Sequence, residues 1–298
     1  MAVEAARRPG ERVPPPPSSR IWSLHGAVTA VVVVAVVAVH VIAWRETEVS
    51  LGVLAEGWEG MADFLGEAVP PDLSWSEVVR PGIDASLVTL YTAILGTTFS
   101  VPVALALAVL AARTTTPGTA VYQASRSVLS FLRAVPDVVF ALIFVTAVGL
   151  GPFPGVLALV FHNVGVMGKL WAEAIEEIDY GPVDALRVGG AGGAQVVANA
   201  VVPAVFPQFV GLFLYRFDVN VRSSLVLGLV GAGGIGFLIN ESIKLFRFDE
   251  MLTYILIVLV MVVVVDNLSA AIRRRIAPKG IALADHGEAG TMDIARQA

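Results

Sequence analysis

The stretch 215–222 places two guanidinium groups, a carboxylate and an amide inside an otherwise strongly apolar part of the chain. Charges in such a segment are costly, and they are typical of transport pathways or ion pairs. Asp218 and Arg222 are four residues apart, so on a helix they can pair on one face. Arg216 has no such neighbour. The candidate pathway residues of this stretch are Tyr215, Arg216, Asp218, Asn220 and Arg222.

Arg216 has two interpretations that the residues alone leave open. A guanidinium in the interior of a helix bundle can hold a phosphate-like anion through two parallel hydrogen bonds. Alternatively, the side chain reaches the membrane interface or bonds to helix ends. His162 and Asn163 lie within another apolar run, where they can form hydrogen bonds between helices or contact a substrate.

The segment 231–236, GAGGIG, fits the letters of the dinucleotide-binding pattern G-x-G-x-x-G. That function requires a βαβ unit around it, whereas its neighbours here are long apolar runs. We therefore interpret Gly231, Gly233 and Gly234 as a backbone bend that lines a cavity at membrane depth. The stretch 165–170 resembles a phosphate-binding loop but lacks the upstream glycine and the hydroxyl residue after Lys169, so it predicts no ATP site.

No catalytic or metal-binding cluster is visible in the sequence. The chain contains no cysteine, and its four histidines are scattered over separate segments. We expect no enzyme activity, no metal and no cofactor held by this chain itself.

A polar, glycine-rich segment, 176–207, interrupts the apolar second half of the chain. Pro182 can start a short helix, and the glycines that follow allow a tight turn. Two short helices joined by such a turn form a compact knob that fits a groove on a soluble partner. The alternative is an ordinary interhelical loop. The candidate coupling residues are Asp184, Ala185, Leu186, Gly190 and Pro203.

These candidate residues are expected to lie on or between membrane-spanning helices. Of 298 residues, 56% are hydrophobic and 15% are charged, and the mean hydropathy is +0.77. Soluble domains carry about 25% charged residues, so this composition predicts an all-α integral membrane protein. Apolar runs near the ~20 residues needed to cross a bilayer predict about six spans. They lie at 24–44, 85–112, 134–150, 156–171, 206–221 and 251–271.

The distribution of basic residues predicts the sidedness of the chain. Arginines precede the first run, follow the second and close the last, and basic loops stay in the cytoplasm. Both termini and the loop 176–207 are therefore expected inside, with 1–23 and 277–298 as tails. The first run is longer than the apolar part of a signal peptide, which favours a retained span. The acidic loop 45–84 is expected outside, as an amphipathic surface helix or a plain linker.

Several stretches resemble a known family. The residues 215–223, YRFDVNVRS, and 226–236, VLGLVGAGGIG, resemble the signature of phosphonate ABC-transporter permeases, the PhnE family of binding-protein-dependent importer permeases. The similarity covers about 82–276, and the family usually has Glu where Asp218 stands. The spacing of 184–186, Gly190 and Pro203 resembles the coupling loop of importer-type ABC permeases, with Asp184 in place of the usual Glu.

The resemblance implies an importer-type, methionine-importer-like ABC permease fold, with 85–276 as the permease domain. It implies a homodimer with a second permease copy in the cell membrane. Two ATP-binding subunits on the cytoplasmic face would hold ATP and Mg, and an extracytoplasmic binding protein would deliver phosphonate, phosphate or phosphite. Nucleic acid is not an implied partner. The alternatives are a permease of another ABC importer, such as one for methionine, and an ATP-independent secondary transporter.

Overall fold

The computed structural model describes residues 24–47 and 50–276, so the tails predicted at 1–23 and 277–298 lie outside it. The chain divides into two compact units, Met1–Ala62 and Asp63–Ala298. The described residues are almost entirely helical.

The first unit contains one long helix and one short helix. Helix α1 (Leu24–Glu46) has 23 residues, is rich in valine and alanine, and is exposed from Ala27 to Glu46. At about 1.5 Å per residue it is long enough to cross a bilayer. Helix α2 (Leu51–Glu56) is capped by Ser50, whose hydroxyl accepts a hydrogen bond from the amide of Val53. Helix α3 (Trp58–Ala68) runs across the boundary into the second unit.

Helix α4 (Arg80–Ala111) is the central helix of the second unit and continues from a π-helical turn, η1 (Trp75–Val79). Every fully buried residue of α4 is glycine, alanine, serine or threonine, whereas its outer face carries Leu87, Tyr91 and Phe99. Small residues let helix backbones approach closely in a membrane, where large apolar groups can face lipid. At Gly96, for example, an added methyl group would lie 2.6 Å from Cβ of Leu159 on α7.

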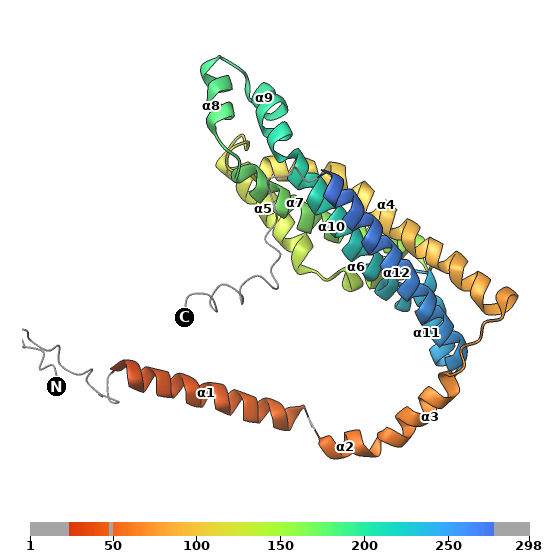
Figure 1. Cartoon of the computed structure of the whole chain (residues 1–298). Coiled ribbons are helices and arrows are strands. Elements are labelled where there is room, and N and C mark those ends of the chain that lie inside the picture. The colour runs from red at the N-terminus through yellow and green to blue at the C-terminus, as the bar shows by residue number, and fades with distance from the viewer. Residues whose placement is uncertain (1–23, 48–49, 277–298) are drawn as a thin grey trace, which may run out of the picture. The chain divides into compact units, whose positions relative to one another are not determined.

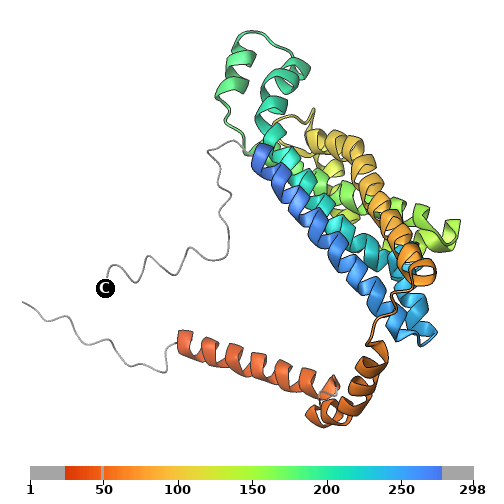
Figure 2. The same ribbon diagram turned by 45° about the vertical axis from the view of Figure 1, so that its right-hand side comes forward.

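Three other long helices complete the second unit: α7 (Pro152–Glu176), α10 (Val202–Leu229) and α12 (Phe248–Ile276). Helix α12 lies beside α10, as both views show (Figure 1, Figure 2). Trp171 of α7 stacks on Phe209 of α10, with ring centroids 4.8 Å apart. The helices at 152–176, 202–229 and 248–276 are longer than the spans predicted from hydropathy alone.

The predicted third span, 134–150, is corrected by the structure. Helix α5 (Thr119–Ala134) ends before Pro136, and α6 (Asp137–Val148) leaves it at an angle of 84°. Proline removes a backbone donor and disfavours the helical conformation in the residue before it, which explains the break. Helix α6 has 12 residues, fewer than the ~20 that cross a bilayer alone. Five helices of the described residues are long and apolar enough to span, or six if this bent pair counts as one.

Short elements mark the two ends of the second unit. Helix α8 (Gly181–Val188), helix α9 (Gly193–Val196) and the π-helical turn η2 (Val197–Val201) form a hairpin that projects from one end (Figure 1, Figure 2). Helix α11 (Ile235–Lys244) lies at the other end. The largest core cluster joins the hairpin to the bundle through Trp171, Ile175, Val183, Val196 and Val205.

Candidate functional site

The hairpin at 181–201 contains most of the predicted coupling residues. Pro182 lies in the first turn of α8, Asp184 follows in that turn, and Arg187 lies in the last turn, an order that suits the helix dipole. The helix ends at Gly189, and Gly190 has a φ of +82°, a conformation that favours glycine. The amide of Ala191 then donates to the carbonyl of Leu186 at 3.0 Å.

The two faces of α8 differ sharply. Val183 is buried against the hairpin's second arm, whereas Asp184 and Ala185 are exposed and Val188 is 90% exposed. Leu186 is half-buried and packs on the core. The structure therefore brings 184–186 and Gly190 together at the tip, whereas Pro203 lies in the first turn of α10. Val188 is thus a single, almost fully exposed apolar side chain at the tip of the hairpin.

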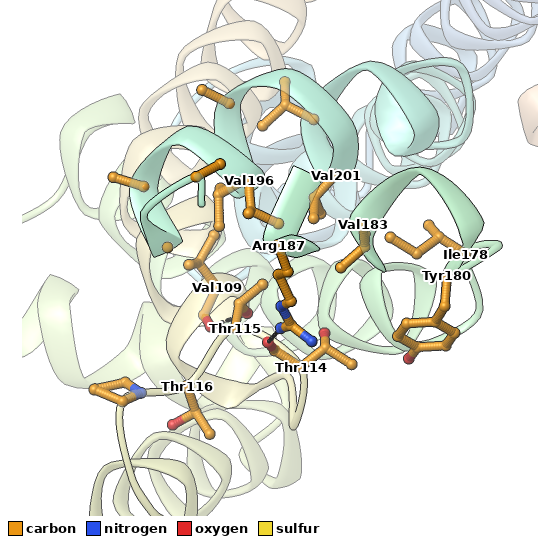
Figure 3. Close-up of a pocket in the computed structure, with 17 residues that line it drawn as sticks. Val109, Thr114, Thr115, Thr116, Ile178, Tyr180, Val183, Arg187, Val196 and Val201 are labelled. Atoms are coloured by element: carbon orange, nitrogen blue, oxygen red, sulfur yellow. Dashed lines mark hydrogen bonds between the residues drawn. The ribbon is translucent and has the colours of Figure 1, made fainter. Parts of the chain in front are cut away.

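A groove of about 760 Å³ separates the hairpin from the loop that follows α4 (Figure 3). Arg187 points into it, and its Nη2 donates to the carbonyl oxygen of Thr114 at 3.3 Å. The lining is mostly valine and alanine, with Thr114, Thr115 and Tyr180 at its rim. The Arg187–Thr114 hydrogen bond and the apolar core cluster that includes Val183 and Val196 therefore hold the hairpin on the bundle.

An ion-pair cluster below the hairpin was not predicted from the sequence. Arg126 of α5 donates through Nη2 to both carboxylate oxygens of Glu176 on α7 at 2.9 Å, and the amide of Arg113 donates to the same carboxylate at 2.8 Å. The Arg113 side chain also bonds to Tyr122, which raises the pKa of that guanidinium. The cluster joins the ends of α4, α5 and α7. Its members are 50 and 63 residues apart, so no local spacing reveals them.

Arg216 has no carboxylate partner within the described residues, in agreement with its sequence neighbours, but distant and local amides bind it. Its side chain is buried, and Nη2 donates to Oδ1 of Asn163 at 2.7 Å and to Oδ1 of Asn220 at 3.4 Å. Asn220 in turn donates to the hydroxyl of Thr97 at 2.7 Å. Neutral amides from α7 and α10 therefore hold this guanidinium, and no carboxylate pairs with it in the described chain.

The predicted pair between Asp218 and Arg222 was wrong. Asp218 pairs with Arg273 at 3.1 Å, and Arg222 pairs with Asp266 at 2.6 Å. Both partners, Arg273 and Asp266, lie on α12. Each carries a charge opposite to that of the α10 residue that it contacts. The predicted pathway residues therefore divide into a buried group, Arg216, Asp218 and Asn220, and an exposed group, Tyr215 and Arg222.

The glycine segment forms the predicted backbone bend, whereas its position along a cavity at membrane depth stays a prediction. Gly231, Gly233 and Gly234 have φ values of +97°, +71° and +72°, which break the chain between α10 and α11. Thr89 of α4 holds the bend, because its hydroxyl accepts from the amide of Ile235 at 3.0 Å. The described residues contain no strand, so the βαβ unit of a dinucleotide site is absent from them.

These features define a helical membrane protein with a projecting hairpin and a polar face on one long helix. Residues 104–278 match the family model described as the inner membrane component of binding-protein-dependent transport systems. The chain belongs to this family.

Two relatives are similar to the chain in sequence, and one solved structure is similar to it in fold. It is 44% identical to the phosphite transport system permease protein PtxC of Stutzerimonas stutzeri over 222 residues, 74% of this chain and 79% of the relative. It is 43% identical to the phosphate-import permease protein PhnE of Mycolicibacterium smegmatis over 221 residues, 74% of this chain and 41% of that relative. A chain of the MetNI methionine ABC transporter aligns with a TM-score of 0.54 at 20% identity, covering 67% of this chain and 96% of that one. The predicted importer-type permease fold is confirmed.

Proposed function

We propose that this chain is the transmembrane permease subunit of an ATP-driven importer for phosphorus oxyanions such as phosphite, phosphonate or phosphate. The observation that carries this proposal is the identity of 44% and 43% to permeases of phosphite transport and phosphate import over most of the chain. The polar stretch 215–223 lies within the residues that match the family model. The likeness to the methionine transporter supports the fold alone, because its identity is 20%.

The proposed partners are a second permease copy, two ATPase subunits and an extracytoplasmic binding protein. The ATPase binds ATP and Mg, and it docks on the exposed tip of α8 formed by Asp184, Ala185 and Val188. Basic residues support a cytoplasmic position for this end of the unit, since Arg113, Arg126 and Arg187 gather there. Both termini are then cytoplasmic, and the loop 45–84 is external.

The continuous helical path from η2 into α10 supports a mechanical link between the hairpin and the transport pathway. ATP binding draws the two hairpins of the dimer together, and α10 moves with them as a two-state element. The pathway is lined by α10 and by the bend at Gly231, Gly233 and Gly234. Arg216 positions α10 against α4 and α7, because its guanidinium is occupied by Asn163 and Asn220.

Uptake into whole cells tests the substrate. Cells that carry the chain with its ATPase and binding protein are given radiolabelled phosphate, with unlabelled phosphite, phosphonate or methionine as competitors. We expect energy-dependent uptake that phosphite or phosphonate lowers and methionine leaves unchanged. Competition by methionine alone would support the methionine importer. Uptake that persists after the ATPase is deleted would support a secondary transporter.

Copurification tests the docking surface. Val188→Asp places a charge at the exposed tip of α8, and Gly190→Trp blocks the turn beside it. We expect both variants to lose the tagged ATPase. Val53→Asp is the matched control, because Val53 is also highly exposed but lies on α2. Full retention of the ATPase by the tip variants would place docking elsewhere.

A further inference from the structure

A small cavity opens between the start of α6 and the middle of α10. Its volume is about 250 Å³, and it is lined by Asp137, Val219, Arg222, Ser223 and Val226. Pockets for drug-sized ligands occupy about 300–1,000 Å³, so this one suits a small polyatomic ion. Two of its polar residues, Asp137 and Ser223, take part in none of the ion pairs of the described residues.

All three polar side chains of this cavity have unused hydrogen-bonding capacity. Arg222 carries five N–H donors, and only Nη2 is engaged, with Asp266 at 2.6 Å. Asp137 accepts from the amide of Val138 through Oδ1 at 2.9 Å, which leaves Oδ2 open. Ser223 makes no hydrogen bond within the described residues. The cavity therefore offers a cation, a hydroxyl and a carboxylate oxygen to a ligand.

This combination matches one form of a phosphorus oxyanion. The unprotonated oxygens accept from a guanidinium and a hydroxyl, and a P–OH group donates to a carboxylate. Phosphoryl groups have a second pKa of about 6, so the singly protonated form exists near neutral pH. An oxyanion without that proton, such as sulfate, would meet Asp137 as a like charge with no hydrogen bond to offset the repulsion.

We infer that Asp137, Arg222 and Ser223 form a transit site that accepts a phosphorus oxyanion in its singly protonated form. This inference rests on the proposed function and adds the ligand form and two residues to it. Arg222 and Ser223 donate to the oxygens, and Asp137 accepts from the P–OH group. Asp266 orients Arg222 from α12, and His162 and Arg216 lie within electrostatic reach of Asp137.

Protection of an introduced cysteine tests the ligand form directly. The chain has no cysteine, so Val226→Cys provides a single thiol on the cavity wall. Its rate of modification by a small thiol reagent is measured in the complete complex with inorganic phosphate or with sulfate. We expect phosphate to slow labelling and sulfate to have no effect. We expect Asp137→Asn to let sulfate protect as well, and Arg222→Gln to abolish protection by phosphate.

Uptake measurements distinguish two roles of Arg222: contact with the substrate and a structural ion pair with Asp266. Arg222→Gln and Asp266→Asn both break the same pair, but only the first removes the guanidinium. We expect Arg222→Gln to lower phosphate uptake about tenfold and Arg222→Lys to give an intermediate rate. Asp266→Asn keeps the guanidinium and loses only its orienting partner, so we expect a smaller loss of uptake than in Arg222→Gln. Copurification with the ATPase is measured for each variant, and Arg222→Lys serves if Arg222→Gln does not assemble.

Two results would overturn the inference. One is equal loss of uptake in Asp266→Asn and Arg222→Gln, which would reduce Arg222 to an ion-pair partner. The other concerns the Val226→Cys protein with no further substitution: phosphate fails to slow labelling of its thiol, or sulfate slows it equally. These outcomes differ from failure of the proposed function, in which the wild-type complex takes up no phosphorus oxyanion at all.

Discussion

At the scale of single residues, the structure separates two arginines that look alike in the sequence. Arg216 is 7% exposed and is held by two asparagine amides, whereas the Arg222 side chain is 53% exposed and lines a cavity. A buried cation needs acceptors for its N–H groups, because an unpaired one loses its hydration without compensation. We therefore propose a structural role for Arg216 and substrate contact for Arg222.

Asn163 should matter for stability because it accepts two N–H groups of Arg216. Asn163→Ala leaves a buried guanidinium with one weak acceptor, and we expect a loss of about 2 kcal/mol or more in folding stability. Thermal unfolding of the purified protein in detergent measures this. Asn267→Ala is the control, since that exposed asparagine bonds only to its own helix. Equal melting temperatures for the two variants would contradict the structural role of Arg216.

Gly236 tests the close approach between α10 and α11. An added methyl group would overlap the carbonyl oxygen of Leu225 and lie 3.1 Å from Cα of Gly228. We expect Gly236→Ala to lower the melting temperature clearly or to abolish expression of folded protein. Gly211→Ala on α10 has no atom within 4 Å of the new methyl group and should be neutral or slightly stabilising. The reverse order of stability would show that α11 does not pack on α10 in this way.

At the scale of elements, two ion pairs of opposite polarity fix α12 against α10. Asp218 pairs with Arg273, and Arg222 pairs with Asp266. A shift of α12 by seven residues would bring Arg273 to the level of Arg222, where like charges repel. The pairs therefore specify one register between the two helices.

Exchange of charges tests this register. Asp218→Arg alone places two cations together and leaves Arg273 without its carboxylate, so we expect poor yield of folded protein. Asp218→Arg combined with Arg273→Asp restores an ion pair and should recover most of the yield. The measurement is monodisperse protein after detergent extraction. A double variant no better than the single one would argue against a direct pair.

The sequence predicted the elements unevenly, and the reasons are physical. Hydropathy located the helices at 80–111, 152–176, 202–229 and 248–276, because a bilayer requires long apolar runs. It failed at 134–150, where Pro136 bends the chain by 84° without interrupting the apolar composition. The hairpin turn at Gly190 and the glycine bend at 231–234 followed from local turn chemistry. The partners of Arg216, Asp218 and Arg222 come from distant helices, so no local spacing could identify them.

At the scale of the whole molecule, the two ends of the second unit differ in charge. The hairpin end carries Arg113, Arg126 and Arg187 beside Glu176 and Asp184, whereas the other end carries Asp72, Asp249 and Glu250 beside Arg247. Asp72 accepts hydrogen bonds from the amide and the hydroxyl of Ser74, which lower the pKa of its carboxyl group. This distribution agrees with a cytoplasmic hairpin.

Labelling of introduced cysteines tests that sidedness, because the native chain has none. We expect Lys244→Cys, at the end of α11, to react with an impermeant reagent on intact cells. Val188→Cys should react only after the membrane is permeabilised. Both side chains belong to exposed residues, so a difference reports sidedness. Labelling of Val188→Cys on intact cells would place the hairpin on the outer face of the membrane, where an ATPase has no ATP.

The most direct test of the account is ATP-driven accumulation of phosphite in vesicles that contain the purified permease, its ATPase and its binding protein. We predict that the wild-type complex accumulates labelled phosphite when ATP is present on the ATPase side, and that Val188→Asp abolishes this accumulation while the permease still folds. Phosphite that enters equally fast without ATP, or that Val188→Asp accumulates at the wild-type rate, would contradict the account.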